Sequence, residues 1–255
     1  MPDSELSIVL VYPELLGTYG DRGNANALVR RAAARGVRTR VVDVPLGEAL
    51  PTSGDLYLLG GSEDAAEVLA LRSLREQKNG TGVLERATVM AVCAGFQILS
   101  KQFLVGDGHR HEGLGLLDVS CGRLAGERAV GEVATQAVGI PGLPPLSGYE
   151  NHQGDATVGP DATPLGRVTS GVGNGPDGTE GAVQGNVVAT YLHGPVLVRN
   201  PALADHLLER STGPLEPFRD EAVEQLRSER LAAAHAERRA GGAPVQRRRL
   251  KVPGR

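Results

Sequence analysis

The sequence predicts an α/β protein with a doubly wound, mostly parallel sheet that is flanked by helices. Short apolar runs, typical of buried strands, alternate with segments in which apolar residues recur at helical spacing. This alternation indicates βαβ units, and Gly-rich loops after the apolar runs allow the tight turns that such units need. The expected strands cover residues 6–12, 38–44, 55–59 and 88–92, and the expected helices cover residues 25–35 and 64–77.

Beyond about residue 114 the pattern changes to short strand-like pieces separated by Gly and Pro. We expect two of these pieces, 128–136 and 182–192, to form an antiparallel extension of the same sheet rather than a second domain. A helix over residues 203–210 would then close the core. A single domain is therefore expected over residues 6–212.

The remaining residues are highly charged. A helical pattern over residues 216–239 predicts a C-terminal helix within 213–240, and the basic segment 241–255 is expected to be a disordered tail. This tail is either a solvated end or a contact for a partner or an anionic membrane surface.

The composition excludes several classes of protein. A chain of 255 residues can bury a full core in one large domain. Two cysteines and no signal peptide predict a cytoplasmic location, and no apolar stretch is long enough to cross a bilayer, so any membrane contact should be peripheral. A net charge of -3 and only 3% aromatic residues argue against nucleic-acid binding.

Cys93 is the strongest catalytic candidate, because it falls where a strand should end and a helix should begin. Residues 96–104 follow it with apolar and polar side chains at helical spacing. The N–H groups and the dipole of such a helix are expected to favour the reactive thiolate, and Gly95 allows close approach of backbone and substrate. The alternative is a buried cysteine that only fills space, which is our interpretation of Cys121.

His193 is the best candidate for the base that a nucleophilic cysteine needs. It follows another apolar run and can reach the same edge of the sheet, although a lone histidine at a strand end more often has a structural role. His152 lies in a polar stretch that we interpret as a loop, where it could either shape the site or be structural. His109 and His111 have no metal-binding partners at useful spacing, so no metal site is predicted.

The loop over residues 17–24 follows the first strand and precedes a helix, as phosphate-binding loops do. Its glycines are three residues apart, which fits neither the dinucleotide-binding motif nor the P-loop. We therefore expect no nucleotide site here, and any ATP-driven chemistry would belong to another chain.

The segment that starts at Cys93, Cys-Ala-Gly-Phe-Gln, resembles the elbow G-x-C-x-G-x-Q of class I glutamine amidotransferases. Ala91 replaces the first glycine, and His193 is followed by Gly-Pro rather than x-Glu, as in the branch that resembles cobyric acid synthase. Further stretches narrow the resemblance to the glutaminase subunits of lipid II isoglutaminyl synthases, the GatD family, over residues 6–212. They are Tyr19-Gly-Asp-Arg-Gly-Asn, Glu112-Gly-Leu-Gly-Leu, Tyr149-Glu-Asn-His-Gln-Gly and Tyr191-Leu-His-Gly-Pro.

This resemblance implies a flavodoxin-like fold and a division of labour between two chains. Proteins of this family release ammonia from L-glutamine and pass it to a Mur-ligase-like subunit, MurT. That partner uses ATP and Mg to amidate the α-carboxyl of D-glutamate in the peptidoglycan stem peptide of lipid II. We therefore expect a heterodimer, no cofactor in this chain, and a cytoplasmic location that can be peripheral to the inner face of the membrane.

The resemblance also implies roles for individual residues. Cys93 would be the nucleophile and His193 the general base and acid. The backbones of Gly61 and Ala94 would stabilise the oxyanion, although the segment Gly60-Gly-Ser-Glu-Asp matches the family's G-G-G-Q-D only in part. The substrate-binding residues would be Arg128, which holds the α-carboxylate of glutamine, together with Gly61 and Gln97.

Two questions stay open at the level of sequence. Asp21 is a candidate for orienting the imidazole of His193, and a Cys-His dyad without an acid is the alternative. The chain could also be a stand-alone cysteine hydrolase such as a γ-glutamyl hydrolase, or a non-catalytic regulatory subunit that has kept the fold.

Overall fold

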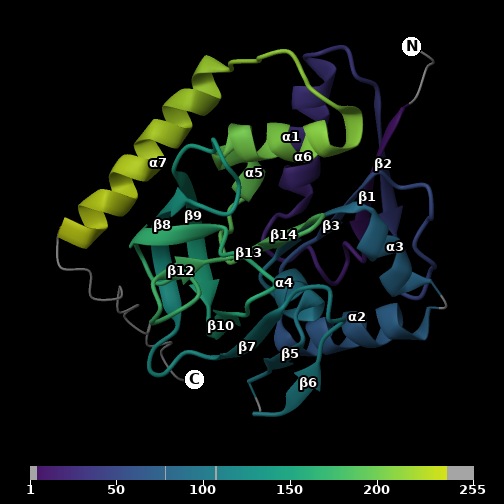
Figure 1. The fold of residues 1–255 in the computed structure, drawn as a ribbon, viewed down its shortest axis with the longest axis vertical. Coiled ribbons are helices and arrows are strands. Elements are labelled where there is room, and N and C mark those ends of the chain that lie inside the picture. Colours follow the sequence, from purple (N-terminus) through teal and green to yellow (C-terminus); the bar gives the residue numbers. More distant parts are fainter. Residues whose placement is uncertain (1–4, 78, 107, 240–255) are drawn as a thin grey trace, which may run out of the picture.

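The computed structural model describes residues 5–77, 79–106 and 108–239. A central six-stranded sheet has the order β13-β14-β4-β3-β1-β2 (Figure 1). Its strands pair in parallel except β13, which runs antiparallel to β14 at the edge. The strands are β1 Leu6–Val11, β2 Thr39–Val44, β3 Leu56–Leu59, β4 Thr88–Val92, β13 Ala182–Gln184 and β14 Val187–Thr190.

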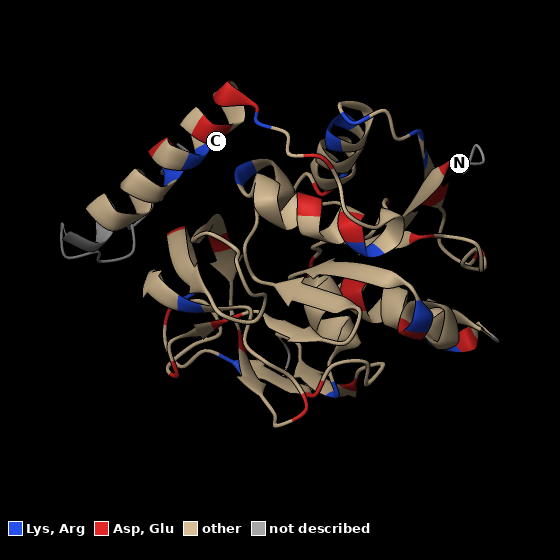
Figure 2. Cartoon of the chain, turned by 45° about the horizontal axis from the view of Figure 1, so that its top comes forward, with Lys and Arg blue, Asp and Glu red and all other residues tan. Residues whose placement is uncertain are grey.

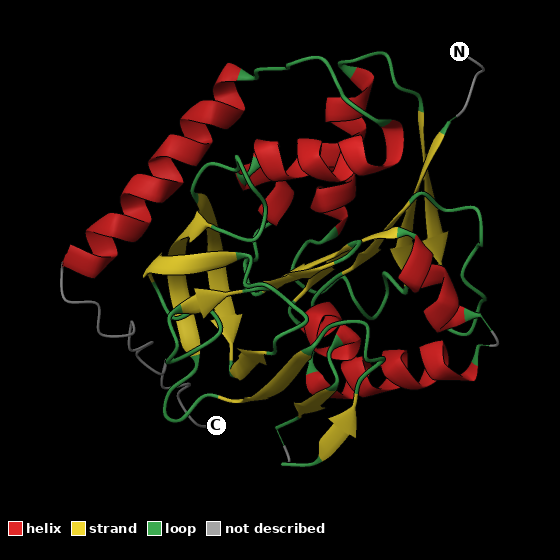
Figure 3. Ribbon diagram, in the orientation of Figure 1, coloured by secondary structure: helices red, strands yellow, loops and turns green. Residues whose placement is uncertain are grey.

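Helices cover both faces of this sheet. Helices α1, α5 and α6 pack together on one face, and α2 and α4 lie on the other (Figure 3). The predicted doubly wound α/β fold is therefore confirmed. The helices are α1 Arg22–Ala33, α2 Asp64–Glu76, α3 Gly80–Arg86, α4 Ala94–Leu99, α5 Val196–Arg199, α6 Pro201–Thr212 and α7 Glu221–Arg239.

The core follows from the position of the strands between two helical layers. Every residue of β1, β3, β4 and β14 is buried, and these strands carry no charged side chain. Figure 2 shows the charged residues mainly on the helices and loops around them. Strands buried on both faces are expected to be continuously apolar rather than alternating, which explains why the sequence marked them so clearly.

Two smaller sheets hold the remaining strands. One has the order β10-β7-β5-β6 and the other the order β12-β11-β8-β9. Their strands are β5 Gln102–Leu104, β6 Arg110–Glu112, β7 Val119–Arg123, β8 Ala129–Ala137, β9 Leu146–His152, β10 Gly154–Val158, β11 Gly166–Ser170 and β12 Thr179–Glu180.

The prediction that residues 128–136 extend the main sheet is wrong. The predicted antiparallel extension over residues 182–192 is confirmed only for β13, because β14 pairs in parallel with β4. β13 closes that edge of the sheet, and its Val183 already forms an isolated bridge to Thr163 on the outer side. The edge therefore has no free backbone groups for β8 there, and β8 instead pairs with β9 and β11.

The structure corrects two further boundaries. The helix after Cys93 ends at Leu99 rather than near residue 104, because the hydroxyl of Ser100 bonds to the carbonyls of Gln97 and Gln102 and turns the chain into β5. The segment around His152 is not a loop but the end of β9. The four strands predicted before Cys93 agree with the structure within one residue at each end.

The long helix α7 packs against β8, β9 and β11 on the outside of their sheet (Figure 1). The hydroxyl of Ser170 donates to the carbonyl oxygen of Ala234 at 2.6 Å. The predicted tail, residues 241–255, lies outside the described residues. Within the described part of the chain, no helix is both long and apolar enough to span a membrane.

Replacing Gly95 by Ala should destabilise the fold. The added Cβ would lie 2.5 Å from the carbonyl oxygen of Leu59 and 2.8 Å from its Cβ, so α4 and β3 would have to move apart. We expect urea denaturation to show a loss of about 1–3 kcal/mol in the free energy of unfolding. Gly82→Ala in α3 is the matched control, because its Cβ would meet only Arg86 Nη1 at 3.6 Å, and stability should rise by roughly 0.5–1 kcal/mol. An equal effect of the two variants would contradict the packing argument.

Candidate active site

Cys93 forms a sharp elbow between β4 and α4. Its φ of 52° and ψ of -106° are unusual, and Tyr12 is the one other described residue besides glycine with a positive φ. The elbow is held from both sides, because the Cys93 N–H donates to Thr190 O at 2.9 Å and the Gly95 N–H donates to Gly60 O at 3.1 Å. Such backbone strain persists only where the surroundings enforce it, and it concentrates at functional sites.

A cavity of about 140 Å³ lies beside Cys93. Of the predicted site residues, Cys93, Gln97 and Arg128 line it. The structure therefore brings together three residues that lie in two distant parts of the sequence. The other lining residues are Ser62, Glu63, Asp64, Glu67, Leu104, Gly106, Arg123, His152, Gln153 and Gly154.

Arg128 directly precedes β8, and Asn151 on the paired strand β9 fixes its guanidinium group. Arg128 Nε donates to Asn151 Oδ1 at 2.8 Å, and Nη2 donates to Asn151 O at 2.7 Å. These two bonds set the plane of the guanidinium at the wall of the cavity. A fixed guanidinium can bind a carboxylate through two parallel hydrogen bonds.

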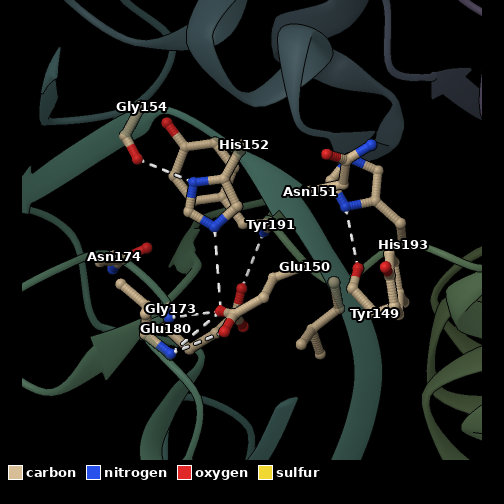
Figure 4. A network of polar contacts seen from close by, with 12 residues as sticks. Tyr149, Glu150, Asn151, His152, Gly154, Gly173, Asn174, Glu180, Tyr191 and His193 are labelled. Atoms are coloured by element: carbon tan, nitrogen blue, oxygen red, sulfur yellow. Dashed lines mark hydrogen bonds and ion pairs between the residues drawn. The ribbon is translucent and has the colours of Figure 1, made fainter. Parts of the chain in front are cut away.

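His193 follows β14 and is tied to Tyr149 by both backbone and side chain. The two residues form an antiparallel bridge, and His193 Nδ1 lies 3.0 Å from Tyr149 O (Figure 4). A carbonyl oxygen can only accept, so Nδ1 carries the hydrogen and Nε2 keeps a free lone pair. Nε2 is buried without a hydrogen-bond partner in the described structure. This is the tautomer that a general base requires.

Tyr19 connects His193 to the elbow. Its ring packs edge-on against the imidazole with 5.1 Å between the ring centroids. A Cβ on Gly61 would lie 2.8 Å from the Tyr19 ring and 3.5 Å from the Cβ of Cys93. Tyr19 therefore lies between His193 and the residues next to Cys93, which places His193 near the cavity. Tyr19 was not among the site residues predicted from the sequence.

The structure does not place Asp21 at the imidazole. Asp21 Oδ2 instead accepts the N–H of Gly61 at 2.9 Å, and burial raises the pKa of Asp21 to about 6. The orientation of His193 comes from the Tyr149 carbonyl, so the dyad alternative fits this geometry. Gly61 is also not a free oxyanion donor here, because its N–H is already engaged. The backbone of Ala94 lies within hydrogen-bonding reach of the Cys93 thiol.

The expectation that the helix end favours a thiolate is not met. Burial raises the pKa of Cys93 well above its ordinary value, nearby Glu67 raises it further, and the hydrogen bond from Ala94 lowers it by less. The cause is desolvation, which disfavours a charge in a dry site. Burial likewise lowers the pKa of His193 to about 4. The resting pair is therefore a neutral thiol and a neutral imidazole.

Glu67 was not among the site residues predicted from the sequence, and the role of His152 was left open. Glu67 lies on the buried face of α2 with Ala70, Leu71 and Leu74. A carboxylate among apolar residues at helical spacing can be recognised in the sequence, so its burial could have been predicted. His152 stacks on Tyr191 with the ring centroids 4.1 Å apart, and its Nδ1 bonds to Gly154 O (Figure 4).

Cys121 and His111 do not line this cavity. Cys121 is buried in β7, where burial raises its pKa to about 12. His111 stacks on Phe103 in the small sheet of β5 and β6. Among the described residues, no three His, Cys, Asp or Glu side chains gather as metal ligands would.

Comparison with known proteins identifies the family of this chain. The CobB/CobQ-like glutamine amidotransferase domain matches residues 7–201. The subunit GatD of the glutamine-hydrolyzing lipid II isoglutaminyl synthase from Staphylococcus aureus is 30% identical over 92% of this chain and 97% of its own length. The chain belongs to the CobB/CobQ-like glutamine amidotransferase family.

Other members of this family show how far the similarity extends. The GatD subunit from Streptococcus pneumoniae is 31% identical over 80% of this chain and 79% of its own length. The cobyric acid synthase of Sphingopyxis alaskensis is 33% identical over 66% of this chain, which spans only 34% of that enzyme. A crystal structure of a glutamine amidotransferase superposes with a TM-score of 0.56 at 21% identity, covering 80% of this chain and 98% of that one, which shows the shared fold.

In this amidotransferase the imidazole of His193 should stay neutral, with its hydrogen on Nδ1, down to about pH 4. Because its folded pKa lies below the ordinary 6.5, the folded state binds fewer protons than the unfolded state between these values. Its contribution to stability is then complete above pH 6.5 and is lost as the pH falls through about 4. Long-range ¹H–¹⁵N spectra of histidine-labelled protein, assigned with His193→Gln, measure this. A titration near 6.5, or a hydrogen on Nε2, would contradict it.

Proposed function

We propose that this chain is the glutaminase subunit of a lipid II isoglutaminyl synthase. It would hydrolyse L-glutamine to glutamate and supply ammonia to an ATP-dependent, Mur-ligase-like partner of the MurT type. That partner would amidate the α-carboxyl of D-glutamate in the peptidoglycan stem peptide. The observation that carries the proposal is a cavity that joins a strained Cys93 to a fixed Arg128, in a chain similar to GatD subunits over most of its length.

The proposed reaction starts from the neutral pair. Cys93 Sγ bonds to the side-chain amide carbon of glutamine while His193 Nε2 takes the thiol proton, so the buried thiolate need not exist in advance. The tetrahedral oxyanion receives the N–H of Ala94, and that of Gly61 once Asp21 releases it. His193 then returns the proton to the leaving nitrogen, and ammonia departs.

The second half of the reaction regenerates the enzyme. Water, with His193 as base, attacks the glutamyl thioester, the C–S bond breaks, and glutamate leaves as the thiol regains its proton. Arg128 would hold the α-carboxylate of substrate and product throughout. Gln97 lines the same cavity and would complete the binding of the substrate.

The need for a partner follows from the amide-forming step, which requires ATP. Amide formation from a carboxylate and ammonia needs an activating ATP with Mg, and the glycine loop before α1 has no P-loop spacing. We assign those cofactors to the partner. Ammonia in neutral water is mostly protonated and then is no nucleophile, so transfer within a heterodimer on the cytoplasmic side of the membrane fits the reaction.

Cys93→Ala should abolish glutamine-dependent amidation of lipid II by the complex co-purified with its ligase partner. Ammonium salts should restore amidation, because the variant lacks only the ammonia source. Product formation with each nitrogen donor is measured by mass spectrometry. A glutamine-analogue diazo ketone should label wild-type Cys93, and Cys121→Ala is the matched control that keeps both labelling and amidation. Unchanged amidation in Cys93→Ala, or no rescue by ammonium, would refute the role.

Arg128→Lys should raise the KM for glutamine by about 10–100-fold with a smaller effect on kcat, because a lysine cannot make the paired hydrogen bonds of a guanidinium. Steady-state glutamate release by the complex measures both constants. Arg110→Lys on exposed β6 is the control and should change neither. If kcat alone fell, Arg128 would not act in binding the ground state of the substrate.

A further inference from the structure

The charges in the Cys93 cavity come in two groups. The cationic side chains, Arg123 and Arg128, come from β7 and from the residue before β8. The lining carboxylates, Glu63, Asp64 and Glu67, all come from the first turn of α2 and the residue before it. A small cavity with both signs of charge on different elements suits a zwitterion such as a free amino acid.

Two of the three carboxylates already have partners in the protein. Glu63 Oε1 accepts the hydroxyl of Tyr19 at 2.8 Å, and Asp64 Oδ2 accepts the N–H of Gly106 at 2.5 Å. Glu67 differs, because its side chain is buried and its Oε1 has no hydrogen-bond partner in the described structure. It also forms no ion pair within the part of the chain that the structure describes.

A buried carboxylate without a partner is costly, and proteins keep few of them. Burial and the neighbouring charge of Asp64 raise the pKa of Glu67 well above its ordinary value. A cation that enters the cavity would reverse this effect by favouring the ionised form. A cation in the cavity would therefore compensate for the burial of Glu67.

We propose that Glu67 binds the α-ammonium group of L-glutamine. This inference rests on the proposed glutaminase function. The amide of the substrate must reach Cys93 Sγ and its α-carboxylate pairs with Arg128, which leaves the ammonium as the one charged group still to be bound. Glu67 lies close enough to Cys93 to influence the thiol, and among the cavity carboxylates it has a buried oxygen without a hydrogen-bond partner in the described structure. It would thus select α-amino acids among primary amides.

The test compares L-glutamine with glutaramic acid, which lacks only the α-amino group. Wild-type complex should favour glutamine in kcat/KM, and Glu67→Gln should reduce this preference by about 10-fold or more, since an ionic hydrogen bond is lost. Activity on glutaramic acid should change much less. Glu76→Gln, exposed at the end of the same helix, is the control and should keep the wild-type preference.

Binding measured by calorimetry in the Cys93→Ala complex separates this proposal from the glutaminase proposal. Glutamine should bind more tightly than glutaramic acid, and Glu67→Gln in that background should remove the difference. That result without any turnover in the wild type would refute the glutaminase function but keep the role of Glu67. If Glu67→Gln weakens both ligands equally, or if Glu63→Gln instead removes the preference, the assignment to Glu67 is wrong.

Discussion

The strained turn at Cys93 is the constraint on which the rest of the site depends. Two backbone hydrogen bonds hold it, from Cys93 N–H to Thr190 O on β14 and from Gly95 N–H to Gly60 O after β3. The same strands position His193 and Gly61, because His193 lies three residues beyond Thr190 and Gly61 directly follows Gly60. The main sheet thus fixes Cys93 relative to His193 and Gly61, the residues proposed to act with it.

Desolvation shifts the pKa values of the two proposed catalytic groups in opposite directions, and both shifts favour the uncharged form. It raises the pKa of Cys93 and lowers that of His193, so the uncharged pair is favoured. In the proposed mechanism, the thiolate and the imidazolium therefore form only as the substrate is attacked.

A main-chain carbonyl, rather than an acidic side chain, orients the imidazole of His193. The carbonyl of Tyr149 orients His193, while Asp21 is engaged with Gly61. The small sheets matter for this reason, because β9 supplies both Tyr149 and the Asn151 that fixes Arg128. The segment that did not join the main sheet therefore brings Arg128 to the cavity beside Cys93.

The sequence by itself determined the parallel sheet, the elbow at Cys93, the strand-end position of His193 and the family, because these depend on local periodicity and on contiguous motifs. Tertiary structure alone decided the pairing of β8 with β9, the engagement of Asp21 with Gly61 and the raised pKa of Cys93. These features depend on contacts between residues far apart in the chain and on the exclusion of water. A local sequence pattern encodes neither the contacts nor the exclusion of water.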